Sequence, residues 1–141
     1  MSSGSFDDFK KFLDTKVRQA ENQTEKFVTM TCQKVEATAK MMMRDSPVNP
    51  DVTYGKKGHH PSYQGNPPAP DTGALMRSVT HSVNEENGQP VGYVGSILAE
   101  YPKDLEYGTS KMKPRPWLSA SLIQCQSWIS QAWEKLKGGR L

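Results

Sequence analysis

Apolar or small side chains recur at steps of three and four along the first third of the chain, which predicts one long amphipathic helix over residues 1–45. Ser5 can cap this helix, and Asp7 and Asp8 would then lie in its first turn, where the helix dipole favours acids. The helix should end near Arg44, because a turn sequence with a proline follows. The positions that form its apolar seam are Phe6, Phe9, Leu13, Val17, Ala20, Thr24, Phe27, Thr31, Val35 and Ala39.

This seam is narrow and close to the pattern of a coiled coil. A helix of about 40 residues that rises ~1.5 Å per residue is a rod of roughly 60 Å. Such a rod is longer than a domain of this size. The pattern is compatible with two arrangements: a bent helix that covers its own sheet, or a helix of which part packs on a neighbouring subunit.

Residues 46–70 have a different composition, in which six prolines and three glycines alternate with polar residues. Neither a helix nor a strand tolerates that density of breakers, so we predict an irregular loop. Loops of this length are usually functional or become ordered on a partner. The middle of the loop is basic through Lys56, Lys57, His59 and His60, which are candidates for contact with DNA or with a neighbouring ring.

The periodicity changes in residues 71–115. We predict, in order, a capped single helical turn at 71–75, a strand at 78–83, a returning strand at 91–95 and a short helix at 101–107. An Asn-Gly dipeptide between the two strands is a strong signal for a tight hairpin turn. This segment should therefore supply a small antiparallel sheet.

Residues 116–137 have a wide apolar stripe at helical spacing, broadened by three tryptophans, which predicts a second long helix. A stripe of this width most often covers one face of a sheet. The expected fold class is α+β: a long N-terminal helix, an irregular Pro-rich loop, a small antiparallel β-sheet and a C-terminal helix packed on the sheet. A chain of 141 residues should form these elements as one domain spanning 1–141.

The composition limits the partners of the chain. Hydrophobic residues make up 35% and the mean hydropathy is −0.72, so we expect a small core and a large polar surface. The net charge of +3 is mild for a dedicated nucleic-acid binder. No apolar run approaches the ~20 residues that span a bilayer, and the N-terminus is acidic, so we expect no membrane partner and a cytoplasm-like compartment.

Two cysteines, Cys32 and Cys125, lie in different predicted helices and in no metal-binding spacing. A reducing compartment favours free, half-buried thiols. A disulfide between them would require the two helices to pack side by side.

No combination of residues predicts catalysis. The histidines are His59, His60 and His81, and none has a nucleophile or an acid placed for a triad. The His59–His60 pair also lacks Cys, Asp or Glu at metal-ligand spacing, so a solvated or DNA-facing loop is the simpler interpretation. We therefore expect no enzyme activity, no catalytic residue, no metal and no cofactor.

Glu106 and Arg115 are the charged residues whose surroundings are most informative. Glu106 precedes a glycine and a threonine, where its carboxylate could accept backbone hydrogen bonds. It could instead pair with Arg115 across the following loop, within one chain or between subunits, and such a pair would serve geometry more than stability.

Four short motifs occur in a fixed order in the second half of the chain. They are Asp71-Thr72-Gly73-Ala74-Leu75 with Ser78, then Val91-Gly92, then Leu105-Glu106-Tyr107-Gly108-Thr109, and finally Arg115-Pro116-Trp117-Leu118. The set resembles the head–tail joining and tail-completion family of long-tailed bacteriophages, in which an N-terminal helix and a proline-rich loop precede the same series. The resemblance covers the 75 residues from Pro67 to the end. Departures are Met76 where arginine is common, Trp117 where phenylalanine is usual, and Lys113-Pro114 where alanine is frequent.

The resemblance implies a structural virion protein of the neck, synthesised in the host cytoplasm. It would be one subunit of a homo-oligomeric ring, with a head-closure or connector protein on one side and a tail terminator or tail tube on the other. Non-specific contact with DNA in the channel is compatible with this position. The residues that the motifs make candidates for ring contacts are Asp71, Thr72, Gly73, Glu106, Gly108, Thr109, Arg115 and Trp117.

Two alternatives accompany this expectation. One is a tail terminator or another tail-end ring subunit, which differs in position rather than in chemistry. The other belongs to a different class: a DNA-binding packaging accessory that uses the basic loop at residues 56–60.

Overall fold

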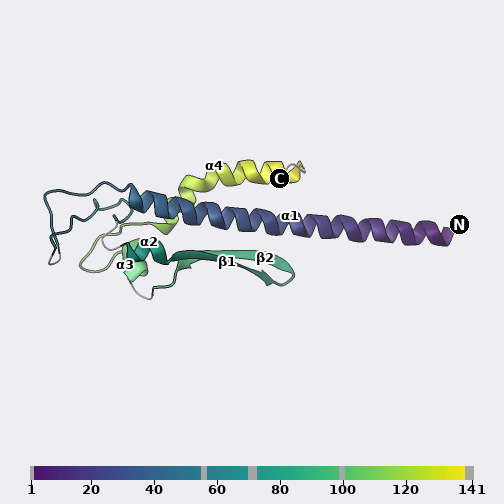
Figure 1. Ribbon diagram of the computed structural model, residues 1–141, viewed down its shortest axis with the longest axis horizontal. Helices are drawn as coiled ribbons and strands as arrows, with labels where there is room; N and C mark the ends of the chain where they lie inside the picture. The colour runs from purple at the N-terminus through teal and green to yellow at the C-terminus, as the bar shows by residue number, and fades with distance from the viewer. Residues whose placement is uncertain (1, 55–56, 70–72, 99–100, 139–141) are drawn as a thin grey trace.

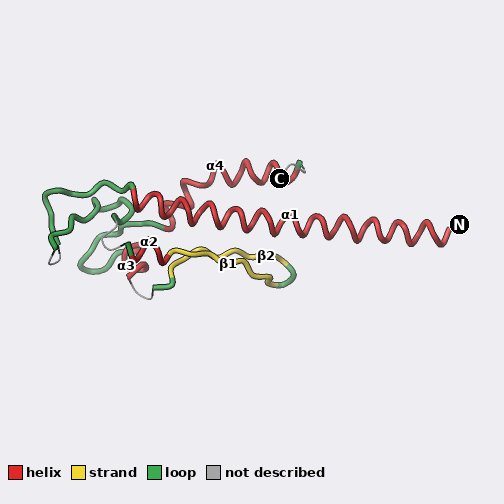
Figure 2. Tube along the Cα trace, viewed as in Figure 1, coloured by secondary structure: helices red, strands yellow, loops and turns green. Residues whose placement is uncertain are grey.

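The computed structural model describes residues 2–54, 57–69, 73–98 and 101–138 (Figure 1). Helices dominate, and one β-hairpin forms the sheet, as Figure 2 shows. The elements in chain order are α1 (Ser2–Arg44), α2 (Ala74–Ser78), β1 (Val79–Glu86), β2 (Gln89–Ser96), α3 (Tyr101–Tyr107) and α4 (Leu118–Lys137).

Helix α1 is 43 residues long and extends far beyond the rest of the molecule (Figure 1). It begins at Ser2, so the predicted cap at Ser5 is wrong, and Asp7 and Asp8 lie beyond the first turn. Residues 2–5 include no proline, the residue that would prevent helical hydrogen bonds from forming there. The predicted end at Arg44 is confirmed.

Helix α1 lies between the hairpin and α4 (Figure 1). Helix α4 runs antiparallel to α1: Cys125 contacts Thr38 at 3.3 Å between Sγ and Oγ1, while the rings of Trp133 and Phe27 lie 5.5 Å apart. Because α4 ends near the middle of α1, it covers only the C-terminal half of the long helix (Figure 1).

The sheet is a two-stranded antiparallel hairpin in which Val79 pairs with Ser96 and Glu86 pairs with Gln89. The turn residues Asn87 and Gly88 have φ of 53° and 77°. Positive φ at both central positions is the signature of the type I′ turn that suits the twist of a hairpin. The hairpin is confirmed, and both strands are longer than the sequence pattern indicated.

The core joins the C-terminal end of α1, the sheet, the short helices and the start of α4. A cluster of buried side chains contains Ala39, Met43, Leu75, Val79, Leu105 and Trp117. Leu118, the first residue of α4, packs against this cluster. The predicted α+β fold class is therefore confirmed, and the remaining apolar stripe of α4 lies along α1.

The loop between α1 and α2 contains no helix or regular strand in its described residues. Two isolated antiparallel bridges fold it back on itself, Val48 with Ser62 and Tyr54 with His59. Of the described helices, none combines the length and the apolar character that crossing a membrane requires.

Candidate interaction surfaces

Glu106 joins the last turn of α3 to the first turn of α4. Its Oε2 accepts hydrogen bonds from the backbone amides of Trp117 at 2.8 Å and Leu118 at 2.9 Å, and its Oε1 accepts one from Ser119 at 2.9 Å. The first amides of a helix have no partner inside the helix. Glu106 therefore caps α4 from another element, and the expectation that it accepts backbone hydrogen bonds is confirmed.

The surroundings of Glu106 act on its ionisation in two directions. Burial alone would raise the pKa of this carboxyl. Hydrogen bonds from the Ser119 side chain and from the amides of Leu118, Ser119 and Trp117 outweigh burial, so the pKa lies below its ordinary value. The carboxylate is thus held in its charged form, next to the positive end of the α4 dipole.

Arg115 serves a different contact. Its Nε donates to the carbonyl oxygen of Ser62 at 3.3 Å, and its backbone amide donates to the carbonyl oxygen of Leu105 at 2.7 Å. Among the described residues, no ion pair joins it to Glu106, so the alternative of a pair within the chain is wrong. The carboxylate of Glu106 is instead directed at the amides of α4, and the guanidinium of Arg115 at Ser62. Arg115 instead ties the loop at residues 46–70 to the segment before α4.

Gly108 and Thr109 shape the tight segment between α3 and α4. Gly108 has φ of +79°, and a side chain there would meet the carbonyl oxygen of Met112 at 2.9 Å and Cδ of Pro114 at 2.9 Å. Its amide donates to the backbone carbonyl oxygen of Asp104 at 2.7 Å, which closes α3. The amide of Thr109 donates to the carbonyl oxygen of Met112 at 2.8 Å. The motif at residues 105–109 therefore ends one helix and places a cap for the next.

Trp117 belongs to the interior of the chain. Its side chain is 3% exposed, and its indole Nε1 donates to the carbonyl oxygen of Pro102 at 2.9 Å. In a single copy the indole therefore contributes to the core, and any role of Trp117 in contacts between subunits would be indirect.

Gly92 of the second motif marks the closest approach of β2 to α1. A side chain at this position would collide with Sγ of Cys32 and meet Cγ1 of Val28 at 3.0 Å. Glycine is needed here for space rather than for an unusual φ. Cys32 and Cys125 are both free, as expected, but they are buried rather than half-buried, and burial raises the pKa of Cys32.

The remaining predicted residues all fall in the connection between α1 and α2. Gly73 has φ of +81° and precedes α2, where its carbonyl oxygen accepts the amide of Arg77 at 3.0 Å. Lys57 and His60 are exposed, and Nδ1 of His60 lies 2.8 Å from the carbonyl oxygen of Val52. His59 is half-buried beside Tyr54. Lys56, Asp71 and Thr72 lie outside the described residues.

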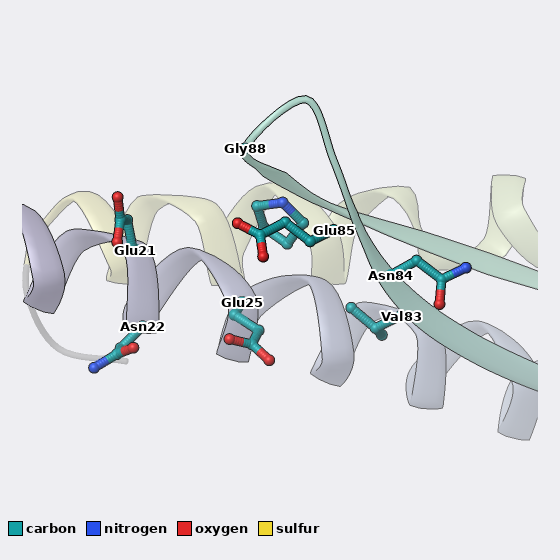
Figure 3. A pocket seen from close by; sticks show the side chains of 8 residues that line it. Glu21, Asn22, Glu25, Val83, Asn84, Glu85 and Gly88 are labelled. Atoms are coloured by element: carbon teal, nitrogen blue, oxygen red, sulfur yellow. The ribbon is translucent and has the colours of Figure 1, made fainter.

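A hollow of about 270 Å³ separates α1 from the tip of the hairpin. Figure 3 shows three carboxylates around it: Glu21 and Glu25 on α1 and Glu85 on β1. Within the described ranges, no group of three or more His, Cys, Asp or Glu is arranged to hold a metal ion. The acidic rim nevertheless gives this side of α1 a negative character.

The N-terminal part of α1 forms a long exposed surface. Every residue from 6 to 22 is exposed, including Phe6, Phe9, Leu13 and Val17. The sequence pattern identified the apolar seam but did not show which part of it the chain covers, so these residues were absent from the predicted site. Their signal was the coiled-coil spacing of the seam.

The chain combines a capped, internally tied domain with a long exposed amphipathic helix. Searches with models of protein families, against curated proteins and against solved structures found no match to it.

Proposed function

We propose that this chain is a structural subunit of a ring in the neck of a tailed double-stranded-DNA phage, where it acts in tail completion and head–tail joining. The four ordered motifs resemble that family. In this chain Gly73, Gly92, Glu106 and Gly108 each fix the backbone at a turn, a close approach or a helix cap. Such residues build a rigid frame rather than a reactive centre.

The observation that carries the proposal is the exposed apolar seam of α1 at residues 6–22. An apolar surface of this kind on a soluble domain is typical of a site for protein–protein contact. A ring subunit needs one surface that fits a different surface on the next copy, so that the rotation closes. The protruding helix supplies one such surface, and the compact domain keeps it in a fixed direction.

In this function the chain acts by assembly. Subunits would close around the DNA channel, while the loop at residues 46–70 and the hairpin tip provide the exposed polar surfaces for axial neighbours. The exposed Lys57 and His60 are suited to an acidic neighbouring ring or to passing DNA. Only mild basic character is required, because a channel that binds DNA tightly would slow its ejection.

The experiment is an amber mutation in this gene in the phage that carries it, with the wild-type chain supplied from a plasmid as control. A neck protein predicts DNA-filled heads and complete tails that accumulate separately and join after complementation. Tails of abnormal length would indicate a tail terminator instead. Empty heads would indicate a packaging accessory, and normal infectious particles would overturn all three assignments.

A further inference from the structure

The N-terminal part of α1, residues 6–22, is here called the α1 extension. Five large apolar side chains on it are between 46% and 70% exposed: Phe6, Phe9, Phe12, Leu13 and Val17. No part of the chain that the structure describes covers them, although helices of this length are marginal in water without a packed face. The extension is therefore the part of the fold whose stability depends most on a partner.

The exposed seam is the direct continuation of an interface that the chain already uses. Phe27 packs against Trp133 of α4, and Leu136 near the end of α4 is buried. Phe6, Leu13 and Ala20 precede Phe27 at steps of seven residues and so lie on nearly the same face of α1. The surface that receives a helix in the C-terminal half thus extends uncovered into the N-terminal half.

Charges differ between the two flanks of this seam. Asp7, Asp14 and Glu21 follow the seam positions Phe6, Leu13 and Ala20, so the carboxylates form a row along one flank, with Lys10 as the cation beside it.

The opposite flank contains Phe12 and Lys16, next to the seam residue Phe9. The ammonium group of Lys16 lies 5.4 Å from the centre of the Phe12 ring. One flank of the extension is therefore acidic, while the other is aromatic with a lysine, and the two flanks are complementary to each other.

We propose that the α1 extension binds the α1 extension of a second copy of this chain, in parallel and in the same register. In parallel coiled coils, the residue before one core position faces the residue five positions later on the partner helix. Lys16 has Glu21 at this spacing, so Lys16 of one copy would meet Glu21 of the other. An antiparallel pair would place the acidic row against itself, which like-charge repulsion disfavours.

A ring also favours parallel α1 helices, because rotation about one axis places the helices of neighbouring copies side by side in the same direction. The inference deepens the proposed function by naming the contact between subunits. It is measurable on the isolated full chain, so its outcome is independent of the amber experiment. A chain that associates as described but is absent from the neck would overturn the function and leave this contact standing.

The test is sedimentation velocity of the full chain from low micromolar to several hundred micromolar concentration. Wild type should associate as concentration rises. Lys16→Glu and Glu21→Lys should each shift association several-fold to higher concentration, and the double reversal should return it toward wild type. Lys11→Glu makes the same charge change away from the seam and should leave association unchanged. All three positions are exposed, so circular dichroism should show unchanged helix content in the four variants.

A second measurement determines direction. In a mixture of Lys16→Cys chains and Glu21→Cys chains, a short thiol-reactive cross-linker should join unlike chains, because parallel pairing brings position 16 to position 21, whereas antiparallel pairing would join like chains. Lys11→Cys chains should not be cross-linked. Failure of wild type to associate at the highest concentration would overturn the proposal. A double reversal as weak as the single variants would overturn the parallel register, and efficient cross-linking through Lys11→Cys would contradict the assigned face.

Discussion

The carboxylate of Glu106, in the last turn of α3, accepts the backbone amide of Trp117 at 2.8 Å and so holds the start of α4. Trp117 occupies the N-cap position of α4 but supplies no side-chain cap of its own. The cap comes from a residue eleven positions earlier, and the indole of Trp117 is fixed in turn by the carbonyl oxygen of Pro102. The two helices and the intervening loop therefore behave as one unit.

Glu106→Ala should lower the free energy of unfolding by about 1–3 kcal/mol, because three amides of α4 lose a charged acceptor. Denaturant unfolding followed by circular dichroism measures this change. Glu134→Ala is the matched control: it removes a surface carboxylate of α4 whose partner, Lys137, is itself exposed. The control should change stability by no more than about 0.5 kcal/mol. Equal effects of the two substitutions would contradict the cap.

The cap should also depend on pH. The pKa of Glu106 is lower in the folded chain than its ordinary value of 4.5, so its contribution is complete above that pH and is lost as pH falls through the folded pKa. The difference in unfolding free energy between wild type and Glu106→Gln should therefore be largest near neutrality and shrink below pH 4.5. Denaturant titrations at a series of pH values measure it. A difference that grew in acid would have the wrong sign.

The sequence predicted the hairpin well because its signal is local. The Asn87–Gly88 dipeptide can adopt positive φ at both positions, and this requirement involves no distant residue. The cap predicted at Ser5 was wrong because a serine can cap a helix but does not by itself stop the helical hydrogen bonds from starting earlier, at Ser2.

The candidate site was harder to predict because its geometry depends on contacts between distant residues. Glu106 had two acceptable partners in the sequence, and only the position of α4 relative to α3 selects the amides over Arg115. The apolar seam indicated the correct face of α1, but it did not indicate how far along that face α4 packs. That limit depends on where α4 returns along α1, which periodicity does not encode.

Gly108→Ala should destabilise the chain more than Gly88→Ala. Both glycines have positive φ, +79° and +77°, so each substitution costs about 1 kcal/mol of backbone strain. Only at Gly108 would the added methyl group also meet neighbours, the carbonyl oxygen of Met112 and Pro114 at 2.9 Å. We expect a further loss of about 1–3 kcal/mol there from overpacking. Thermal and denaturant unfolding of the two variants provide the comparison, and equal losses would refute the close contact.

Gly92→Ala tests how the hairpin is seated on α1. The new methyl group would collide with Sγ of Cys32 and meet Val28 at 3.0 Å, so we expect a loss of about 1–3 kcal/mol in unfolding free energy. Gly95→Ala on the same strand is the control, because a methyl group there meets nothing within 4 Å. It should change stability by no more than about 0.5 kcal/mol.

The two residues on either side of this contact can also be changed together. Cys32→Ala removes the sulfur that the methyl group of Gly92→Ala would strike, and the two changes should couple because the side chains share one space. The loss in the double variant should therefore be smaller than the sum of the single losses. Denaturant unfolding of the four proteins gives the coupling free energy directly. Strict additivity, or equal losses at Gly92 and Gly95, would show that β2 does not approach α1 at Cys32.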